Sequence, residues 1–471
     1  MTKLVISASK FQSQVSDLLP CNKYMKSELI YSLLKRYKLL DLFDYVIEKP
    51  NCLSIDFAQF HSQDYLNILL NEDHNSVMPF DEEEAKWAHL KDISRDWTEN
   101  SFNNADKYDT NDQWFEERVD LFNYYKSLTV SGLKNRKRSA LEALLIDYEP
   151  ENGDNSTEKE YKKEKARLKE FNLEGDCPIF SFLPMYCHVI TGASLMLVDY
   201  MQKDSIERTI AINWDGGRHH ALKRKASGFC YINDIVLVIQ KLRKKGFNKV
   251  SYLDFDLHHG DGVEKAFQYS SNIQTISMHM YETGFFPCSG SLEDAKRGKN
   301  IVNIPLLHGV DDEYLKRITS DIVIPLSEKH SPDAILIQCG GDGLIGDGFA
   351  EWQLTIHGLT ACIMNVINNF PQCSIVLVGG GGYNELVMSR FYTFLTFNIL
   401  QTYAKEKPPM DLFGHHEDED VLIPEHEFIE LYSKEYYNYW IYEKEGSQKR
   451  KNLKNDNSLE YIKTLQNFYK L

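Results

Sequence analysis

The chain has 471 residues, and its 69 acidic and 53 basic side chains give a formal net charge of −16. This acidic balance argues against direct binding to nucleic acid, which depends on Lys and Arg side chains that neutralise phosphates. The nine cysteines form no CxxC pair, so we predict reduced, mostly buried thiols in an intracellular protein. The sequence has no apolar run long enough to cross a bilayer, and its first residues lack the apolar core of a signal peptide.

The first part of the chain divides into a periodic stretch and a polar one. Residues 25–43 and 57–70 have the apolar spacing of amphipathic helices, and we expect them to belong to the same domain as the later residues. Residues 72–170 differ, because they contain an acidic run, an Asn- and Asp-rich stretch and a run of mixed charge. This composition predicts an inserted segment that is partly helical and partly disordered.

From residue 171 the chain alternates short β-branched runs with longer amphipathic stretches. We expect strands at 208–214, 249–256, 272–279, 333–340 and 373–380, and helices at 232–246, 313–330, 352–370 and 386–404. Strands separated by helices form βαβ units, so the sequence predicts a single α/β domain over 1–471 with a central, mostly parallel sheet flanked by helices. Residues 405–471 are expected to form a peripheral extension whose aromatic stretch packs as a helix.

The most unusual stretch is "DFDLHHGDG" at 254–262, directly after a predicted strand. Side chains alternate along a strand, so Asp254, Asp256 and His258 share one side where that strand ends. Asp256 and His258 thus aim an oxygen and a nitrogen at one point, a donor set that suits zinc. Taken alone, the motif fits a salt-bridged, solvated loop equally well.

Three further stretches place polar groups at the ends of other predicted strands. They are "WDGGRHHALKRKASGFCYIND" (214–234), "QCGGDGLIGDG" (338–348) and "LVGGGGYNE" (377–385). Each has an ordinary structural explanation, because glycine-rich turns and surface histidines are common. In a parallel sheet, however, functional groups gather beyond the carboxyl ends of the strands, so four such motifs together predict one shared site.

Six ordered motifs identify a family resemblance. "GGRHHA", "SGFCYIND", "DFDLHHGDGVEKAF", "GFFPCSG", "GGDG…GD" and "GGGGY" closely resemble the zinc-dependent histone deacetylases of the class I type, well over 171–404 and loosely over the first seventy residues. The resemblance implies an arginase-like α/β fold, and it implies hydrolysis of N6-acetyl-lysine on histones or other chromatin-associated proteins, with release of acetate. It also implies a nuclear location, with the cytoplasm as a second compartment.

The resemblance assigns catalytic and metal-binding roles residue by residue. Zn²⁺ would be held by three residues: Asp256, His258 and Asp342. His220 would be the general base and then the acid for the departing amine, and His219 its electrostatic companion. Asp254 would orient His219, and Asp261 would orient His220. Tyr383 would donate its hydroxyl to the developing oxyanion.

The resemblance also assigns substrate and potassium contacts. Phe229 and Phe286 would wall a tunnel for the lysine stem, the Gly228 carbonyl would lie near the substrate amide, and Asp176 would grip the substrate backbone at the rim. A structural K⁺ is expected near five residues, largely through backbone oxygens: Asp254, Asp256, His258, Ser277 and Met278. The implied partners are an acetylated protein substrate and complex subunits, without nucleic acid or membrane.

The sequence departs from the family pattern at several positions. Asn22 stands where the family has a basic residue at the foot of the tunnel. Leu307 and Leu386 stand where complex-bound nuclear members carry arginines for an inositol phosphate, so we expect no such regulation. The insertion at 72–170 enters just before the rim, where it would shape access or bind a partner.

Three other functions are alternatives to the deacetylation of protein lysine. A binuclear manganese ureohydrolase needs DxHxD and DxD, but this chain misplaces the third carboxylate of the first motif and has one aspartate where the second needs two. A catalytically inactive scaffold would lack His220, Tyr383 or a metal ligand, and all of them are present. Deacetylation of acetylpolyamines is not excluded by the catalytic residues, although Asp176 favours protein substrates.

Overall fold

The computed structural model describes residues 2–22, 25–71, 163, 165–180, 182–414, 421–444 and 453–471. Most of the insertion expected at 72–170 lies outside these residues. So do the basic run "KNRKR" (134–138), most of "QKRKNLK" (448–454) and the residues 415–420 of the acidic stretch "GHHEDED". All nine cysteines are described and none of them forms a disulfide; seven are buried, Cys21 is half-buried and Cys288 is exposed, which confirms the predicted thiols.

Within the described part of the chain, a single sheet of eight strands forms the centre of the fold, in the order β2-β1-β3-β8-β7-β4-β5-β6. The strands are β1 (Thr2–Ser7), β2 (Tyr45–Ile47), β3 (Arg208–Asn213), β4 (Val250–Asp254), β5 (Ile273–Met280), β6 (Ile301–Leu306), β7 (Ala334–Gln338) and β8 (Ser374–Val378). Every neighbouring pair is parallel, which confirms the predicted sheet. β1, β2 and β6 were not predicted from the sequence. Pro305 in β6 is tolerated because this strand lies at the edge of the sheet.

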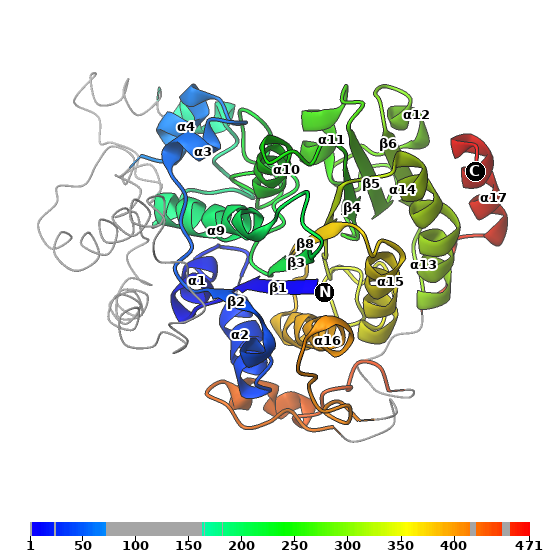
Figure 1. Ribbon diagram of the computed structural model, residues 1–471. Coiled ribbons are helices and arrows are strands. Elements are labelled where there is room, and N and C mark those ends of the chain that lie inside the picture. The colour runs from blue at the N-terminus through cyan, green and yellow to red at the C-terminus, as the bar shows by residue number, and fades with distance from the viewer. Residues whose placement is uncertain are drawn as a thin grey trace, which may run out of the picture.

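Helices cover both faces of the sheet (Figure 1). They are α1 (Lys10–Ser16), α2 (Lys26–Arg36), α3 (Ser54–Phe57), α4 (Gln63–Leu69), α9 (Leu183–Leu197), α10 (Asp234–Lys244), α11 (Asp261–Phe267), α12 (Leu292–Ala295), α13 (Asp312–Ile318), α14 (Ile324–His330), α15 (Ile356–Asn369), α16 (Glu385–Tyr403) and α17 (Leu459–Tyr469). Ile210 and Ile212 of β3 join the core shared with α2, α15 and α16, whereas Ala211 joins the core shared with α9 and α10. β3 is therefore buried on both faces, which accounts for the continuous apolar run at its centre.

Two helical segments differ from the sequence expectation for identifiable reasons. The helix predicted at 313–330 is α13 followed by a π-helical turn (Thr319–Val323) and α14. The turn immediately precedes the first residues of α14, where Pro325 supplies no backbone N–H. α9 was not predicted, because all of its residues are buried and it lacks the periodic polar face of a surface helix.

The described residues of the C-terminal extension contain one α-helix, α17, at the edge of the molecule (Figure 1). The aromatic stretch expected to be helical instead forms a 3-10 helix (Ile429–Glu435) followed by turns. Tyr432, Tyr439 and Trp440 from this stretch are fully buried. The tyrosine and tryptophan side chains thus serve as core, although their backbone is irregular.

Candidate active site

The four polar motifs converge at one edge of the sheet. They follow β3, β8, β7 and β4, which are consecutive neighbours, and parallel strands end on the same side. Each strand is buried along its whole length, and each continues into a loop that carries the polar side chains. The fold therefore brings together residues that lie more than a hundred positions apart in the chain, as predicted for the carboxyl ends of such strands.

The first group in this site consists of Asp256, His258 and Asp342, all nearly inaccessible to solvent. Nδ1 of His258 lies 2.8 Å from Oδ2 of Asp342 and 3.3 Å from Oδ1 of Asp256. One potential ligand atom from each of the three residues lies within 4.8 Å of the other two. Two carboxylates and one imidazole at this spacing provide the donor set of a three-ligand zinc site.

The remaining oxygens of these carboxylates are held by neighbouring groups. Oδ2 of Asp256 accepts from Nε2 of Gln338 at 2.6 Å and from the backbone N–H of Gly381 at 2.8 Å. Oδ1 of Asp342 accepts from the N–H of Leu257 at 2.8 Å. A Cβ at position 381 would lie 2.4 Å from Oδ2 of Asp342, so only glycine fits this approach. The two carboxylates are thus fixed before any cation binds.

The electrostatics of this group favour a cation. Burial raises the pKa of Asp342, and the neighbouring charge of Asp256 raises it further. Burial would lower the pKa of His258, but hydrogen bonds to Asp256 and Asp342 outweigh it and raise the pKa to about 10. The imidazolium proton therefore neutralises part of the charge that two buried carboxylates concentrate here. A divalent cation would fulfil the same role, so the residues fit a metal.

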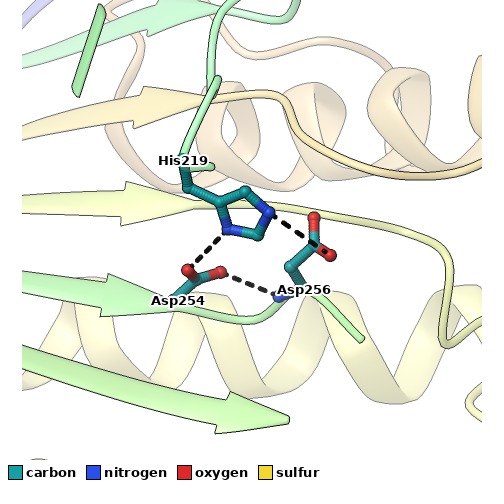
Figure 2. Close-up of side chains that lie close together, drawn as sticks. All are labelled: His219, Asp254 and Asp256. Atoms are coloured by element: carbon teal, nitrogen blue, oxygen red, sulfur yellow. Dashed lines mark hydrogen bonds and ion pairs between the residues drawn. The ribbon is translucent and has the colours of Figure 1, made fainter. Parts of the chain in front are cut away.

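Figure 2 shows the second group, His219 between Asp254 and Asp256. Nδ1 of His219 lies 2.8 Å from Oδ2 of Asp254, and its Nε2 lies 3.8 Å from Oδ1 of Asp256. Tyr252 donates its hydroxyl to the same Asp254 oxygen at 2.5 Å. Burial opposes a charge on His219, but Asp254 and Asp256 outweigh it and raise its pKa to about 9. His219 is therefore a cation at neutral pH.

His220 differs from its neighbour in charge. Its Nδ1 lies 2.9 Å from Oδ1 of Asp261, while its ring centroid lies 3.9 Å from that of His219. Burial and the adjacent charge of His219 lower the pKa of His220 to about 4, despite the opposing effect of Asp261. His220 is therefore neutral at pH 7, with Nδ1 donating to the carboxylate and Nε2 left as an acceptor. Neighbouring histidines with opposite protonation states mark a site of proton transfer.

Aromatic rings surround these polar groups. Phe286 lies against His220, with ring centroids 4.8 Å apart, and Phe229 packs edge-on against Tyr383 at 5.7 Å. Gly228 and Phe229 both adopt positive φ, and a Cβ on Gly228 would lie 2.5 Å from the His220 ring. Burial raises the pKa of the Tyr383 hydroxyl well above its usual value, and the charge of Asp342 raises it further, so the group stays protonated. The predicted residues Gly228, Phe229, Phe286 and Tyr383 therefore lie close together, next to the His220 ring.

Three residues of this site were missed by sequence reasoning. The Phe349 ring lies 4.7 Å from that of His258 and 5.3 Å from that of Tyr383, and it is 40% exposed. Phe285 stacks on His258 with centroids 5.2 Å apart. Phe349 follows the "GDG" of the Asp342 motif, and Phe285 precedes Phe286 within "GFFPCSG". Both rings therefore stand directly beside residues of the quoted motifs, and this proximity was the signal that could have identified them.

The third missed residue is Lys26. It is nearly buried, and its Nζ donates to the backbone oxygens of Gly380 at 3.3 Å and Gly382 at 2.9 Å. The amide of Asn22 instead donates to Ser16 O at 3.2 Å. A basic side chain thus reaches the glycine turn from a position four residues after Asn22, which stands where the family has its basic residue.

The structure also places the residues predicted to contact substrate and potassium. It is compatible with their predicted roles but does not test them. Asp176 is exposed on the loop before α9. Ser277 of β5 accepts a hydrogen bond from the N–H of Gly260 at 3.4 Å and pairs with His279, and Met278 is buried in the core. The expected K⁺ near these residues stays a prediction. Among the described residues, no helix has the length and apolar character needed to cross a bilayer.

Comparison with known proteins agrees with this geometry. A sequence model described as "Histone deacetylase domain" matches residues 20–398. "Histone deacetylase HOS1" from Saccharomyces cerevisiae is 49% identical over 488 aligned positions, which cover all of both chains. "Histone deacetylase 1" from Homo sapiens is 40% identical over 261 positions, covering 54% of this chain and 52% of the relative. "Histone deacetylase 8" from Xenopus tropicalis is 38% identical over 257 positions, covering 54% and 68%. The chain therefore belongs to the histone deacetylase family, a family of hydrolases.

Proposed function

We propose that this chain is a zinc-dependent protein lysine deacetylase that removes the acetyl group from N6-acetyl-lysine on histones or other chromatin-associated proteins in the nucleus. The observation that carries the proposal is the buried Asp256–His258–Asp342 group beside a charged and a neutral histidine. The family match and the relatives named as histone deacetylases support the same substrate class. When bound to the three ligands, Zn²⁺ would polarise the acetyl carbonyl and lower the pKa of water.

The protein's own groups provide the proton transfers. The neutral His220 accepts a proton at Nε2 from the water that adds to the carbonyl carbon, because Asp261 fixes the tautomer through Nδ1. The same nitrogen then returns the proton to the departing lysine amine as the C–N bond breaks. The products are acetate and free lysine. His219 stays charged because Asp254 and Asp256 hold its proton, so its field opposes premature protonation of His220.

Tyr383 stabilises the charge that develops on the carbonyl oxygen. Its raised pKa keeps the phenol protonated at neutral pH, so that it can donate. Its ring is held between Phe229 and Phe349, which restricts the direction of the hydroxyl. A positioned donor lowers the barrier only when it meets the charge of the transition state, so the fixed ring is central to the proposal.

The aromatic walls account for the choice of substrate. Phe229, Phe286 and Phe349 present flat apolar faces that suit the methylene stem of a lysine whose charge is masked by acetylation. The exposed Asp176 would accept from the substrate's backbone N–H groups at the rim, which favours a peptide over a polyamine. Leu307 and Leu386 offer no charge to an inositol phosphate, so tight activation by such a compound would contradict this part of the proposal.

The deciding experiment measures acetate released by the purified full-length chain from an acetyl-lysine histone-tail peptide and from an acetylpolyamine. We expect turnover of the peptide, loss of turnover on zinc chelation, and recovery on addition of one equivalent of Zn²⁺. Preference for the acetylpolyamine would refute the protein substrate but not the chemistry. Absence of turnover of both compounds by zinc-loaded protein would support the inactive scaffold instead.

A further inference from the structure

Residues 421–444, here named the C-terminal segment, pack against the helix that begins after Tyr383. The family match ends at residue 398, so this segment lies beyond it. In Figure 1 it runs beneath α2 and α16. Tyr432 lies 2.7 Å from the Ser389 hydroxyl, and the Tyr439 hydroxyl donates to the backbone oxygen of Arg390 at 2.5 Å. The segment is therefore joined to α16 by buried polar contacts as well as by apolar packing.

A buried ion pair forms the strongest of these contacts. The guanidinium of Arg390 lies 2.7 Å from Oε2 of Glu435, and both side chains are at most 3% exposed. Arg390 also donates to the backbone oxygen of Asn438 at 3.0 Å and to that of Leu386 at 2.8 Å. Burying either charge alone is costly, so the pair requires α16 and the C-terminal segment to stay together.

Hydrogen bonds continue from this ion pair to the residue next to Tyr383. Tyr442 donates its hydroxyl to the second oxygen of Glu435. The same hydroxyl accepts from Nδ2 of Asn384 at 3.3 Å. Asn384 is the N-cap of α16, since its Oδ1 accepts from the backbone N–H groups of Leu386 and Val387. The C-terminal segment therefore reaches the position at which the glycine turn becomes a helix.

The ring of Tyr442 also supports the loop that carries Asp342. Gly346 in that loop has φ of +94°, and a Cβ there would lie 2.4 Å from the ring of Tyr442. Asn384 donates to the Gly346 oxygen at 2.8 Å, and Asp347 accepts from the N–H of Tyr383 at 2.6 Å. Tyr442 thus contacts both the loop that carries Asp342 and the residue that follows Tyr383. At this point the two loops are hydrogen-bonded to each other.

We propose that Tyr442 is a positioning residue for Tyr383, and that the C-terminal segment is a working part of the active site. The inference rests on the proposed donor role of Tyr383. Four glycines precede Tyr383, and glycine-rich backbone has many accessible conformations, so the direction of the ring depends on external support. Displacement of a catalytic group by about 1 Å can lower a rate about a hundredfold, so even a small relaxation of this support reduces turnover.

The kinetic test replaces Tyr442 by Phe in the full-length, zinc-loaded chain. This variant keeps the ring on Gly346 and loses the hydroxyl bonds to Asn384 and Glu435. We expect kcat for an acetyl-lysine peptide to fall about fivefold to twentyfold, with KM within about twofold of the parent. The control is Tyr436→Phe, which alters a 78% exposed tyrosine of the same segment and should leave both parameters unchanged.

A double-mutant cycle asks whether Tyr442 acts through Tyr383. In a Tyr383→Phe background the donor is already absent, so Tyr442→Phe should reduce kcat by less than about twofold. An equal reduction in both backgrounds would overturn the proposal, because it would show a general effect on the fold. Equal kcat for Tyr442→Phe and the parent chain would overturn it as well.

Hydrogen exchange separates this proposal from the proposed function, because it needs no turnover. Tyr442→Phe should speed exchange of the amides of Tyr383, Leu386 and Val387, which bond to Asp347 and Asn384, and should leave β5 unchanged. An inactive parent chain with this exchange pattern would refute the deacetylase proposal and support the positioning contact. Exchange identical to the parent's would refute the positioning contact.

Discussion

The ammonium of Lys265 lies 2.8 Å from Oδ2 of Asp261, and the other oxygen of this carboxylate bonds His220. The proposed general base is therefore linked through one carboxylate to a half-exposed lysine four residues further along α11. The positive charge of Lys265 offsets part of the negative charge that Asp261 presents to the imidazole of His220. This weakens the stabilisation of a protonated His220 and so lowers its basicity. The link connects the protein surface with the proton-transfer step.

This relationship predicts a pH shift in Lys265→Met. With the cation removed, Asp261 interacts more fully with His220 and raises the pKa of that histidine above its present value of about 4. His220 must be neutral to accept a proton, so the acidic limb of kcat/KM should move to higher pH, by less than about one unit because Lys265 is solvated. The control is Lys296→Met, which breaks the exposed pair with Glu293 away from the site. A shift to lower pH would contradict the role of Asp261.

Tyr383→Phe should lower kcat about 10²–10³-fold, because it removes the donor to the oxyanion and keeps the ring. KM and the amount of bound zinc should stay within about twofold of the parent, because the proposed role of the hydroxyl lies neither in substrate binding nor in metal binding. Steady-state kinetics and elemental analysis measure these quantities, with the 75% exposed Tyr269→Phe as the control. Retention of half the parent kcat would eliminate Tyr383 as the donor.

Asp342→Asn should prevent stoichiometric zinc binding, because a neutral amide replaces one of two charged ligands. The parent chain should gain about 2.7 kcal/mol of unfolding free energy at a free zinc concentration of a hundred times Kd, whereas the variant should gain almost none. Zinc titration monitored by thermal unfolding measures this without a substrate. Asp333→Asn, which alters a surface pair with Lys203, is the control. Equal stabilisation of both chains would place the metal elsewhere.

Phe349→Ala should weaken substrate binding, because it removes one aromatic face beside His258 and Tyr383. We expect KM for the acetyl-lysine peptide to rise about three- to tenfold, with partial recovery in Phe349→Leu. The exposed Ile206→Ala, before β3, should behave like the parent. If Phe349→Ala lowered KM, the ring would obstruct the substrate path and would not line it.

Arg390→Met should destabilise the fold by about 3–5 kcal/mol, because it leaves the Glu435 carboxylate buried without its counter-charge. Urea unfolding measures the loss. The double variant Arg390→Met, Glu435→Leu removes both charges and should regain most of the stability. Equal stability of the single and double variants would mean that Glu435 is protonated or solvated after the loss of Arg390.

The motifs at strand ends could be predicted because their information is local. The alternation of polar and apolar residues from Asp254 to His258 predicted a shared side for Asp254, Asp256 and His258, and the apolar-leaning run before them identified the strand, although β4 itself ends at Asp254. The sheet order then brings Asp342 and Tyr383 to the same edge, which the sequence indicates through the alternation of strands and helices. These site residues could therefore be proposed from the sequence without a structure.

The residues that were missed depend on tertiary contacts between distant segments. Lys26 reaches Gly382 across 356 positions, and Tyr442 reaches Asn384 across 58. Neither side chain belongs to a motif, and lysine and tyrosine are common at surfaces. The buried aromatic stretch at 432–442 was assigned to the periphery for the same reason, since its polar composition conceals that several of its rings fill the core.

The position of β8 makes closure of the sheet a late event in the synthesis of the chain. β8 is the last of the described strands along the chain, yet it lies between β3 and β7 in the middle of the sheet. A nascent chain that stops before Ser374 leaves β3 and β7 without this neighbour, and unpaired strand edges invite aggregation. Insertion of this one five-residue strand therefore joins the two halves of the sheet, and Tyr383 and the C-terminal segment that supports it follow in the chain only afterwards.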